Sequence, residues 1–216
     1  MDKNIQIDQN LIDYIFSHTE HLHPIQKKLL KYNDNLGHIK RLQISILQAN
    51  FLQFLIKIKK INSCLEIGTF TGYSTLSMAI SLPKNGKIHT IDNDVSKKQI
   101  VQTFFKKAKL SNKLKIEISN ANVALDSLIK NKNKYDLILI DADKKNYISY
   151  FNKTLKLLNK NGLILVDNIL WKGKVSNNNA KDKLTISIKD FNKHVKKNKI
   201  NKYILPVGDG FCICWK

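Results

Sequence analysis

Apolar residues follow two different spacings along this chain, and the change falls near residue 60. Over 1–60 they recur every three or four positions, which is typical of helices that are buried through one face. From 61 onward, short apolar runs alternate with amphipathic stretches, which is the pattern of strands separated by helices. The chain is therefore expected to form one domain over 1–216, with a helical cap over 1–60 and an α/β core over 61–216.

Three helices are predicted in the cap. The first covers 5–16, Pro24 opens the second in its first turn, and Gly37 closes it. Residues 38–41 form a polar linker that we expect to be mobile, and the third helix covers 42–58. Its predicted buried face consists of Leu42, Ile46, Ala49, Leu52 and Ile56.

Seven strands are predicted in the core. Helical stretches such as 74–80 and 96–109 separate the first five, so these strands should be parallel and covered by helices on both faces. Only residues 207–210 join the last two strands, which is too short for a crossover, so these should form an antiparallel hairpin. The predicted strands are 63–67, 87–92, 114–119, 136–141, 163–167, 202–206 and 211–215.

The first two strands end in residues that suit a nucleoside. Ligands of parallel sheets bind beyond the carboxyl ends of the strands. The first strand runs into a turn with Gly68 and Gly72, and the second ends at Asp92, an acid that could accept hydrogen bonds from ribose hydroxyls. No dinucleotide or P-loop fingerprint is present, which favours a nucleoside without pyrophosphate, such as S-adenosylmethionine. Ordinary turn glycines would explain Gly68 and Gly72 equally well.

The fourth and fifth strands end in oxygen-bearing side chains. The fourth strand ends at Asp141, and the fifth ends at Asp167, which Asn168 follows. If the two strands are neighbours, they lie about 4.8 Å apart and these side chains can converge. Two carboxylates and an amide oxygen suit Mg²⁺. The alternative is that Asp167 and Asn168 only cap the loop that follows.

Composition adds a strong positive charge. Lys and Arg number 37 against 17 Asp and Glu, which gives a net charge of +20 and favours anionic partners, including nucleic acid. The lysines are nevertheless spread among Asn and Ile along the whole chain, as in a solvated surface without a partner. No long apolar run or leader pattern is seen, so we expect a soluble cytoplasmic protein without a membrane partner. The three cysteines lie in apolar runs and are expected to be buried thiols.

Seven short motifs follow one another along the chain: Leu-Glu-Ile-Gly (65–68), Thr-Gly-Tyr-Ser (71–74), Asp-Ala-Asp-Lys (141–144), Asn-Tyr (146–147), Asp-Asn (167–168), Leu-Trp (170–171) and Leu-Pro-Val-Gly-Asp-Gly (205–210). Taken in order, they resemble the cation-dependent O-methyltransferases, the group that contains the caffeoyl-CoA and catechol O-methyltransferases. The resemblance runs from about residue 42 to the C-terminus. It implies a Rossmann-like methyltransferase fold, whose mostly parallel seven-stranded sheet has an antiparallel C-terminal hairpin strand, and usually a homodimer.

The resemblance also implies roles for individual residues. Asp141, Asp167 and Asn168 would bind Mg²⁺, and Lys144 would be the general base, with Asp141 and Asn168 completing the catalytic set. The S-adenosylmethionine site would comprise Glu66, Gly68, Tyr73, Ser74, Asp92, Ala121 and Asp141. The substrate would contact Ile39, Lys144, Tyr147 and Trp171.

These roles predict a Mg²⁺-dependent S-adenosylmethionine O-methyltransferase. Its acceptor would be a hydroxyl of a small catechol-type aromatic diol, as in natural-product biosynthesis. The alternative is methylation of 5-hydroxyuridine in tRNA, which the charge of +20 would suit. A third interpretation is a basic binding module that keeps the fold without turnover.

Overall fold

The computed structural model describes residues 5–19 and 21–216. Its N-terminal part contains α1 (Gln9–Ser17), α2 (Pro24–Asp34), the 3-10 helix η1 (Gly37–Leu42) and α3 (Ile46–Ile58). Pro24 lies in the first turn of α2, as predicted. The expected linker 38–41 is instead part of η1, and Leu42 is 56% exposed at its end, so Leu42 does not belong to the buried face of the third helix. On that face the fully buried residues are Ala49, Leu52 and Ile56.

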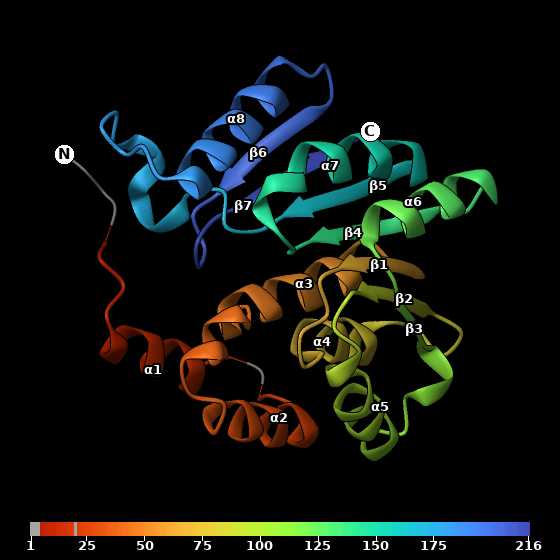
Figure 1. Cartoon of the computed structure of the whole chain (residues 1–216). Helices are drawn as coiled ribbons and strands as arrows, with labels where there is room; N and C mark the ends of the chain where they lie inside the picture. The colour runs from red at the N-terminus through yellow and green to blue at the C-terminus, as the bar shows by residue number, and fades with distance from the viewer. Residues whose placement is uncertain (1–4, 20) are drawn as a thin grey trace.

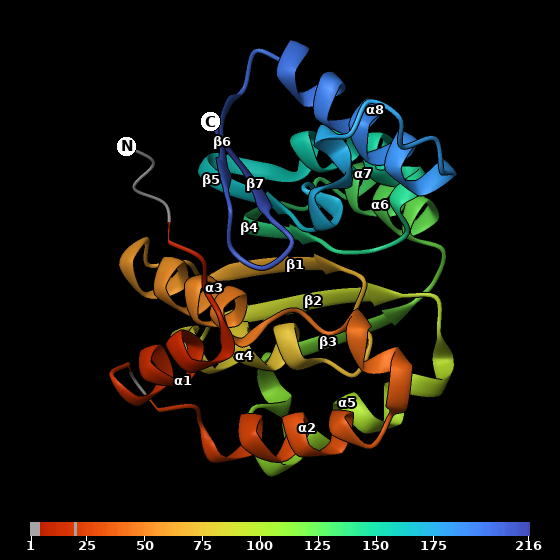
Figure 2. The ribbon, with the colours of Figure 1, turned by 90° about the vertical axis from the view of Figure 1, so that its left-hand side faces the viewer.

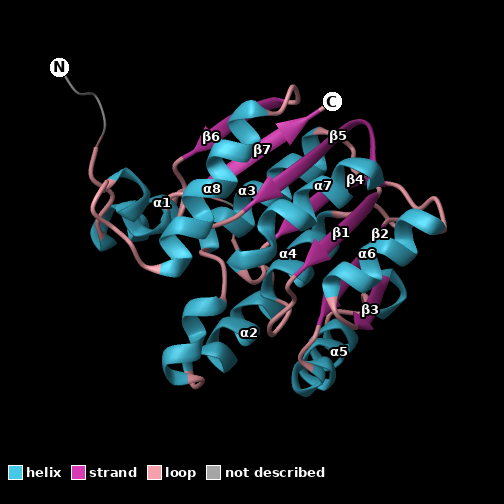
Figure 3. Cartoon of the chain, turned by 45° about the horizontal axis from the view of Figure 1, so that its top comes forward, coloured by secondary structure: helices cyan, strands magenta, loops and turns pink. Residues whose placement is uncertain are grey.

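Seven strands form one sheet in the order β3-β2-β1-β4-β5-β7-β6 (Figures 1 and 3). The first five are parallel, and β7 runs antiparallel to both of its neighbours, which confirms the predicted parallel sheet with an antiparallel hairpin. The strand β5 begins at Leu158 and not at 163. The bounds are β1 (Ser63–Ile67), β2 (Lys87–Asp92), β3 (Leu114–Ile118), β4 (Tyr135–Ile140), β5 (Leu158–Val166), β6 (Asn201–Leu205) and β7 (Phe211–Trp215).

Helices cover both faces of the sheet. In Figure 1, α6, α7 and α8 lie on one side and α3, α4 and α5 on the other, and Figure 2 shows α1 and α2 outside this second layer. The remaining bounds are α4 (Tyr73–Ser81), η2 (Val95–Lys97), α5 (Lys98–Lys107), η3 (Ser111–Lys113), α6 (Ala121–Lys130), η4 (Lys144–Asn146), α7 (Tyr147–Leu157), η5 (Trp171–Ser176) and α8 (Lys183–Lys197). Within the described ranges, no helix is long and apolar enough to span a bilayer.

The core is divided between the two faces by the alternation of side chains along each strand. In β4, Ile138 and Ile140 join the cluster under α6, α7 and α8, whereas Leu137 and Leu139 join the cluster under α3, α4 and α5. All four are fully buried, as expected for a central parallel strand that reads as a continuous apolar run. The predicted burial of the cysteines is also confirmed. The free, buried thiols are those of Cys64, Cys212 and Cys214.

Hydrogen bonds between neighbouring strands continue one residue past the strand ends. The backbone N–H of Asp141 donates to the carbonyl oxygen of Ile67 (2.9 Å), and that of Asp167 donates to Ile140 (3.0 Å). Because β1, β4 and β5 are adjacent and parallel, these bonds place both aspartates at the same edge of the sheet. The predicted neighbourhood of the fourth and fifth strands is therefore confirmed.

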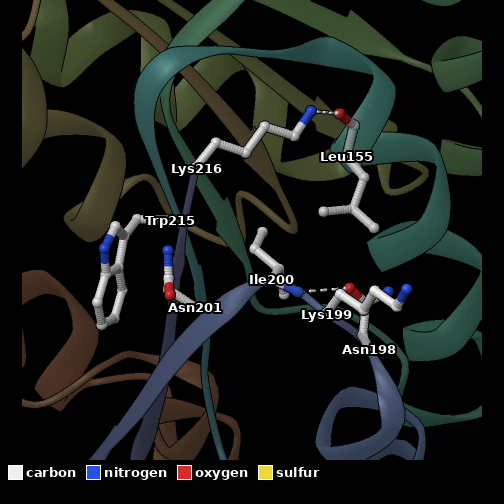
Figure 4. A pocket seen from close by; sticks show the side chains of 7 residues that line it. All are labelled: Leu155, Asn198, Lys199, Ile200, Asn201, Trp215 and Lys216. Carbon is white, nitrogen blue, oxygen red and sulfur yellow. Dashed lines mark hydrogen bonds between the residues drawn. The ribbon is translucent and has the colours of Figure 1, made fainter.

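A cavity of 320 Å³ lies near the end of β7, and Figure 4 shows the side chains that line it. Trp215, which is paired with Asn201, is at the far end of β7, beside the start of the parallel strands. This cavity is therefore remote from the aspartates. Its lining residues are Leu155, Asn198, Lys199, Ile200, Asn201, Trp215 and Lys216.

Candidate functional site

Oxygen atoms from the ends of β4 and β5 converge on the ammonium group of Lys144. Its Nζ lies 3.1 Å from Oδ1 of Asp141 and donates to Oδ1 of Asn168 (2.6 Å). It also donates to the hydroxyl of Tyr147 at 2.6 Å. The side chains of Lys144 and Asp141 are only 13% and 17% exposed, so solvent screens this charge cluster weakly. Asp141, Asn168 and Tyr147, which were all predicted to lie in the site, thus surround the ammonium group of Lys144.

Asp167 lies directly beside this cluster and is almost completely buried, with 1% of its surface exposed. Its Oδ1 accepts hydrogen bonds from Nε2 of Gln48 (2.5 Å) and from the backbone N–H of Asn168 (2.6 Å). Burial, together with the nearby charge of Asp141, raises the pKa of Asp167 above its ordinary value. Two carboxylates this close resist joint ionisation, and a bound divalent cation would reverse that tendency.

The donor set fits a hard divalent cation. Across the described part of the chain, no three His, Cys, Asp or Glu side chains come together as a metal site. The candidate ligands are therefore two carboxylates and the amide oxygen of Asn168, which are ligand types that Mg²⁺ accepts while keeping positions for water or substrate. In this structure two of these oxygens, the carboxylate oxygen of Asp141 and the amide oxygen of Asn168, already face the positive charge of Lys144.

Asp92, predicted to bind ribose, holds the glycine turn against the end of β2. Its Oδ2 accepts hydrogen bonds from the backbone N–H groups of Thr69 (2.7 Å) and Phe70 (3.0 Å), and its Oδ1 accepts one from Asp94 (2.9 Å). A carboxylate has about four lone-pair sites. Asp92 therefore retains capacity to accept a further hydrogen bond from a ligand.

Glu66 offers a second acceptor near the same edge. It is fully buried, and its Oε2 accepts hydrogen bonds from the hydroxyls of Thr75 and Thr90. Its Oε1 is buried and makes no hydrogen bond of normal geometry among the described residues, although the side chain of Ser74 is near enough to lower the pKa of the carboxyl. A buried acceptor without a hydrogen bond raises the free energy of the folded protein. A bound ligand that donates a hydrogen bond to Oε1 would remove this penalty. Among the other predicted cofactor residues, Tyr73 and Ser74 begin α4 and are buried, and Ala121 begins α6 and is partly buried.

Substitution Glu66→Gln is expected to change how stability depends on pH. Burial raises the pKa of Glu66 from 4.5 to about 7, so the folded protein holds this proton more tightly than the unfolded chain does. The contribution of this protonated carboxyl to the free energy of unfolding is therefore fully present below pH 4.5. It is lost as the pH rises through about 7. Glutamine cannot lose a proton, so the variant should lack this component.

Urea denaturation at about pH 5 and at about pH 8 measures the difference. The free energy of unfolding of the wild type should fall more between the two values than that of Glu66→Gln. Parallel changes in the two proteins would contradict the assignment, because residues common to both titrate identically.

The predicted substrate residues differ in their surroundings. The ring of Tyr147 is fully buried and packs edge-on against Phe191, with ring centroids 5.5 Å apart. The centroid of this ring also lies 4.9 Å from Nζ of Lys144, and its hydroxyl donates to the carbonyl oxygen of Asp167 (3.1 Å). A contact between Tyr147 and the substrate stays a prediction. Trp171 begins η5 and is partly buried, and Ile39 is partly buried in η1.

Two further residues were missed by the sequence predictions. Gln48, in the first turn of α3, reaches Asp167 across 119 positions of sequence. Its spacing from Ser45 matches a capping box, a signal that predicts a helix start but not a distant contact. Asp209, in the turn between β6 and β7, accepts hydrogen bonds from the backbone of Leu170 and Lys172, so it holds the loop that carries Trp171.

The chain is similar to several proteins named as O-methyltransferases over most of its length. A "Probable caffeoyl-CoA O-methyltransferase 1" of Dictyostelium discoideum is 31% identical over 221 residues, which cover 100% of this chain and 95% of that protein. The caffeoyl-CoA O-methyltransferase of Stellaria longipes is 34% identical over 79% of this chain and 74% of its own length. The O-methyltransferase of Bacillus cereus, solved in complex with SAH, superposes with a TM-score of 0.84 at 27% identity, over 94% of this chain and 96% of that one.

The family model for O-methyltransferases matches residues 16–216. This match includes the whole sheet and every strand end described above. The chain therefore belongs to the O-methyltransferase family.

Proposed function

We propose that this protein is a Mg²⁺-dependent S-adenosylmethionine O-methyltransferase that acts on a small aromatic diol of the catechol type. The observation that carries this proposal is the convergence of Asp141 and Asn168 on the ammonium group of Lys144, with Asp167 alongside. Relatives named as caffeoyl-CoA O-methyltransferases support the aromatic acceptor. The relative solved with SAH supports the cofactor.

The residues of the site divide the chemical work. Asp141, Asp167 and Asn168 would hold Mg²⁺, whose charge, when bound, favours the ionised form of a phenol hydroxyl that ordinarily has a pKa of about 10. Lys144 lies within hydrogen-bond reach of two of these ligands, so it can also reach a hydroxyl held beside them. To take the proton of that hydroxyl, Lys144 would act as the neutral amine, a form that the charge of a bound divalent cation would favour. S-adenosylmethionine would supply the methyl group, and Glu66 and Asp92 would hold it at the neighbouring strand ends.

Substitution Tyr147→Phe is expected to lower kcat about tenfold. This loss is smaller than the whole rate contribution of a general base, because Lys144 itself remains. The variant keeps the buried ring but removes the hydroxyl that fixes Nζ of Lys144. Its free energy of unfolding should fall by only about 1 kcal/mol, as for one buried hydrogen-bonded group. Initial rates at saturating cofactor, paired with urea denaturation, measure both effects. An unchanged kcat would mean that Lys144 does not depend on this hydroxyl.

The proposed function is tested by a methylation screen with labelled S-adenosylmethionine, across simple catechols and total tRNA, with and without Mg²⁺. We expect transfer to catechols that stops in excess EDTA and returns when Mg²⁺ is restored. Undiminished transfer in EDTA would contradict the metal assignment. Transfer to tRNA alone, at a rate that falls steeply with salt, would show that the acceptor is a nucleic acid. The net charge of +20 would then serve to bind its phosphates.

A further inference from the structure

Gln48 connects the helical cap to the candidate metal site through a side chain that is only 2% exposed. Its amide nitrogen Nε2 donates to Oδ1 of Asp167 at 2.5 Å. Its amide oxygen Oε1 accepts a hydrogen bond from the backbone N–H of Ser45 at 3.0 Å. Both ends of the amide are therefore engaged. Rotating the amide by half a turn would bring its oxygen against the carboxylate and its nitrogen against a donor, so only one orientation is satisfied.

The turn between β6 and β7 closes the other side of this amide. Gly208 has a φ of +59°, and a Cβ atom at that position would overlap the side-chain amide of Gln48. The absence of a side chain at position 208 therefore leaves the space that the amide of Gln48 occupies. Three segments that are far apart in sequence, the start of α3, the end of β5 and the β6–β7 turn, thus meet at one hydrogen bond.

The contact with Gln48 also selects which carboxylate oxygen of Asp167 remains available. Gln48 and the backbone N–H of Asn168 donate to the same oxygen, Oδ1. Neither bond uses Oδ2, so the carboxylate is oriented through one oxygen while the other is uncommitted by them. The donor is also neutral. A lysine or arginine at this place would orient Asp167 as well, but its charge would repel a cation.

We propose that Gln48 is a positioning residue for the divalent cation, because it orients Asp167 without adding charge to the site. This inference rests on the proposed function, in which Asp167 is a ligand of that cation. Partners that hydrogen-bond to metal ligands typically account for about 10- to 100-fold in metal affinity when they are removed.

The test is a titration of the full-length protein with Mn²⁺, followed by electron paramagnetic resonance of the free ion and by calorimetry. Gln48→Met has a similar length but no donor, and Gln48→Asn keeps an amide that is too short to reach Asp167. Both should raise the Kd for Mn²⁺ about tenfold or more. S-adenosylmethionine binding, measured by calorimetry on the same samples, should change less than about twofold, which shows that each variant is folded.

The matched control is Ser45→Ala. It removes the hydroxyl that accepts the backbone N–H of Gln48 (3.2 Å), and so weakens the start of α3, but it leaves the amide contact with Asp167 in place. This variant should lower Tm and keep the Mn²⁺ affinity of the wild type. An equal loss of affinity in Ser45→Ala would assign the effect to the helix start and overturn the inference.

The remaining outcomes separate the two proposals. If the wild type binds Mn²⁺ and both Gln48 variants bind it equally well, Gln48 has no positioning role, while the proposed function stands. If the wild type binds no divalent cation, the metal part of the proposed function fails, and this inference fails with it.

Discussion

Asp141→Asn is expected to lower kcat for catechol methylation about 10³-fold, which corresponds to about 4 kcal/mol of lost transition-state stabilisation. The substitution keeps the shape of the side chain but removes one of the two carboxylate charges at the strand ends. It also leaves Lys144 without its ionic partner at 3.1 Å. Initial rates measured at saturating cofactor over a range of Mg²⁺ concentrations should show a lower kcat together with a weaker dependence on the metal.

Asp143→Asn is the matched control for this prediction, because it makes the same chemical change two residues away. The carboxylate of Asp143 accepts hydrogen bonds from the hydroxyl of Tyr150 and the amide of Asn146, both at 2.6 Å. These contacts secure the start of α7 and do not involve Lys144. The Asp143 variant should keep most of the wild-type activity. Similar losses in the two variants would contradict a special role for Asp141.

Gly68→Ala is expected to lower the free energy of unfolding by about 3 to 5 kcal/mol, the sum of backbone strain and overpacking. Gly68 has a φ of +95°, and a Cβ atom there would overlap the backbone carbonyl oxygen of Asp141. The end of β4 would have to move, so the variant should also lose activity in the fraction that remains folded. Urea denaturation with a parallel rate measurement tests both effects.

Gly37→Ala separates the two causes of this loss. Gly37 also has a positive φ, +59°, but nothing lies within 4 Å of a Cβ atom at that position. Its substitution should cost about 1 kcal/mol, from strain alone. If the Gly37 and Gly68 variants lose equal stability, the close approach between the ends of β1 and β4 is not what requires glycine.

Most of the sheet could be predicted from sequence because apolar runs ended at turn residues. The bounds of β1, β2 and β7 agree with the predicted ones for this reason. The early start of β5 was missed because Leu158, which pairs with Tyr135, is followed by the polar residues Asn159, Lys160 and Asn161. Their side chains carry no apolar pattern, and the backbone pairs with β4 across an irregularity in register.

The residues of the site that lie at the strand ends could be predicted from the sequence. Asp141, Asp167 and Asn168 each follow a parallel strand, and adjacent parallel strands bring such residues together. The full burial of the Tyr147 ring also had a signal in the sequence. Tyr147 and Phe151 are four residues apart on the buried face of α7, a spacing that favours the core over a pocket. The contact of Gln48 had no comparable signal, since no local pattern encodes a partner that is distant in sequence.

The hydrogen bonds that continue the sheet past β4 and β5 fix the backbone of the candidate site. The amide protons of Asp141 and Asp167 are bonded to Ile67 and Ile140, within the central strands of the sheet. Such protons exchange with solvent mainly when the whole domain unfolds. The ligand backbone is thus expected to be as rigid as the interior of the sheet before any ligand arrives, so that little ordering entropy remains to oppose binding.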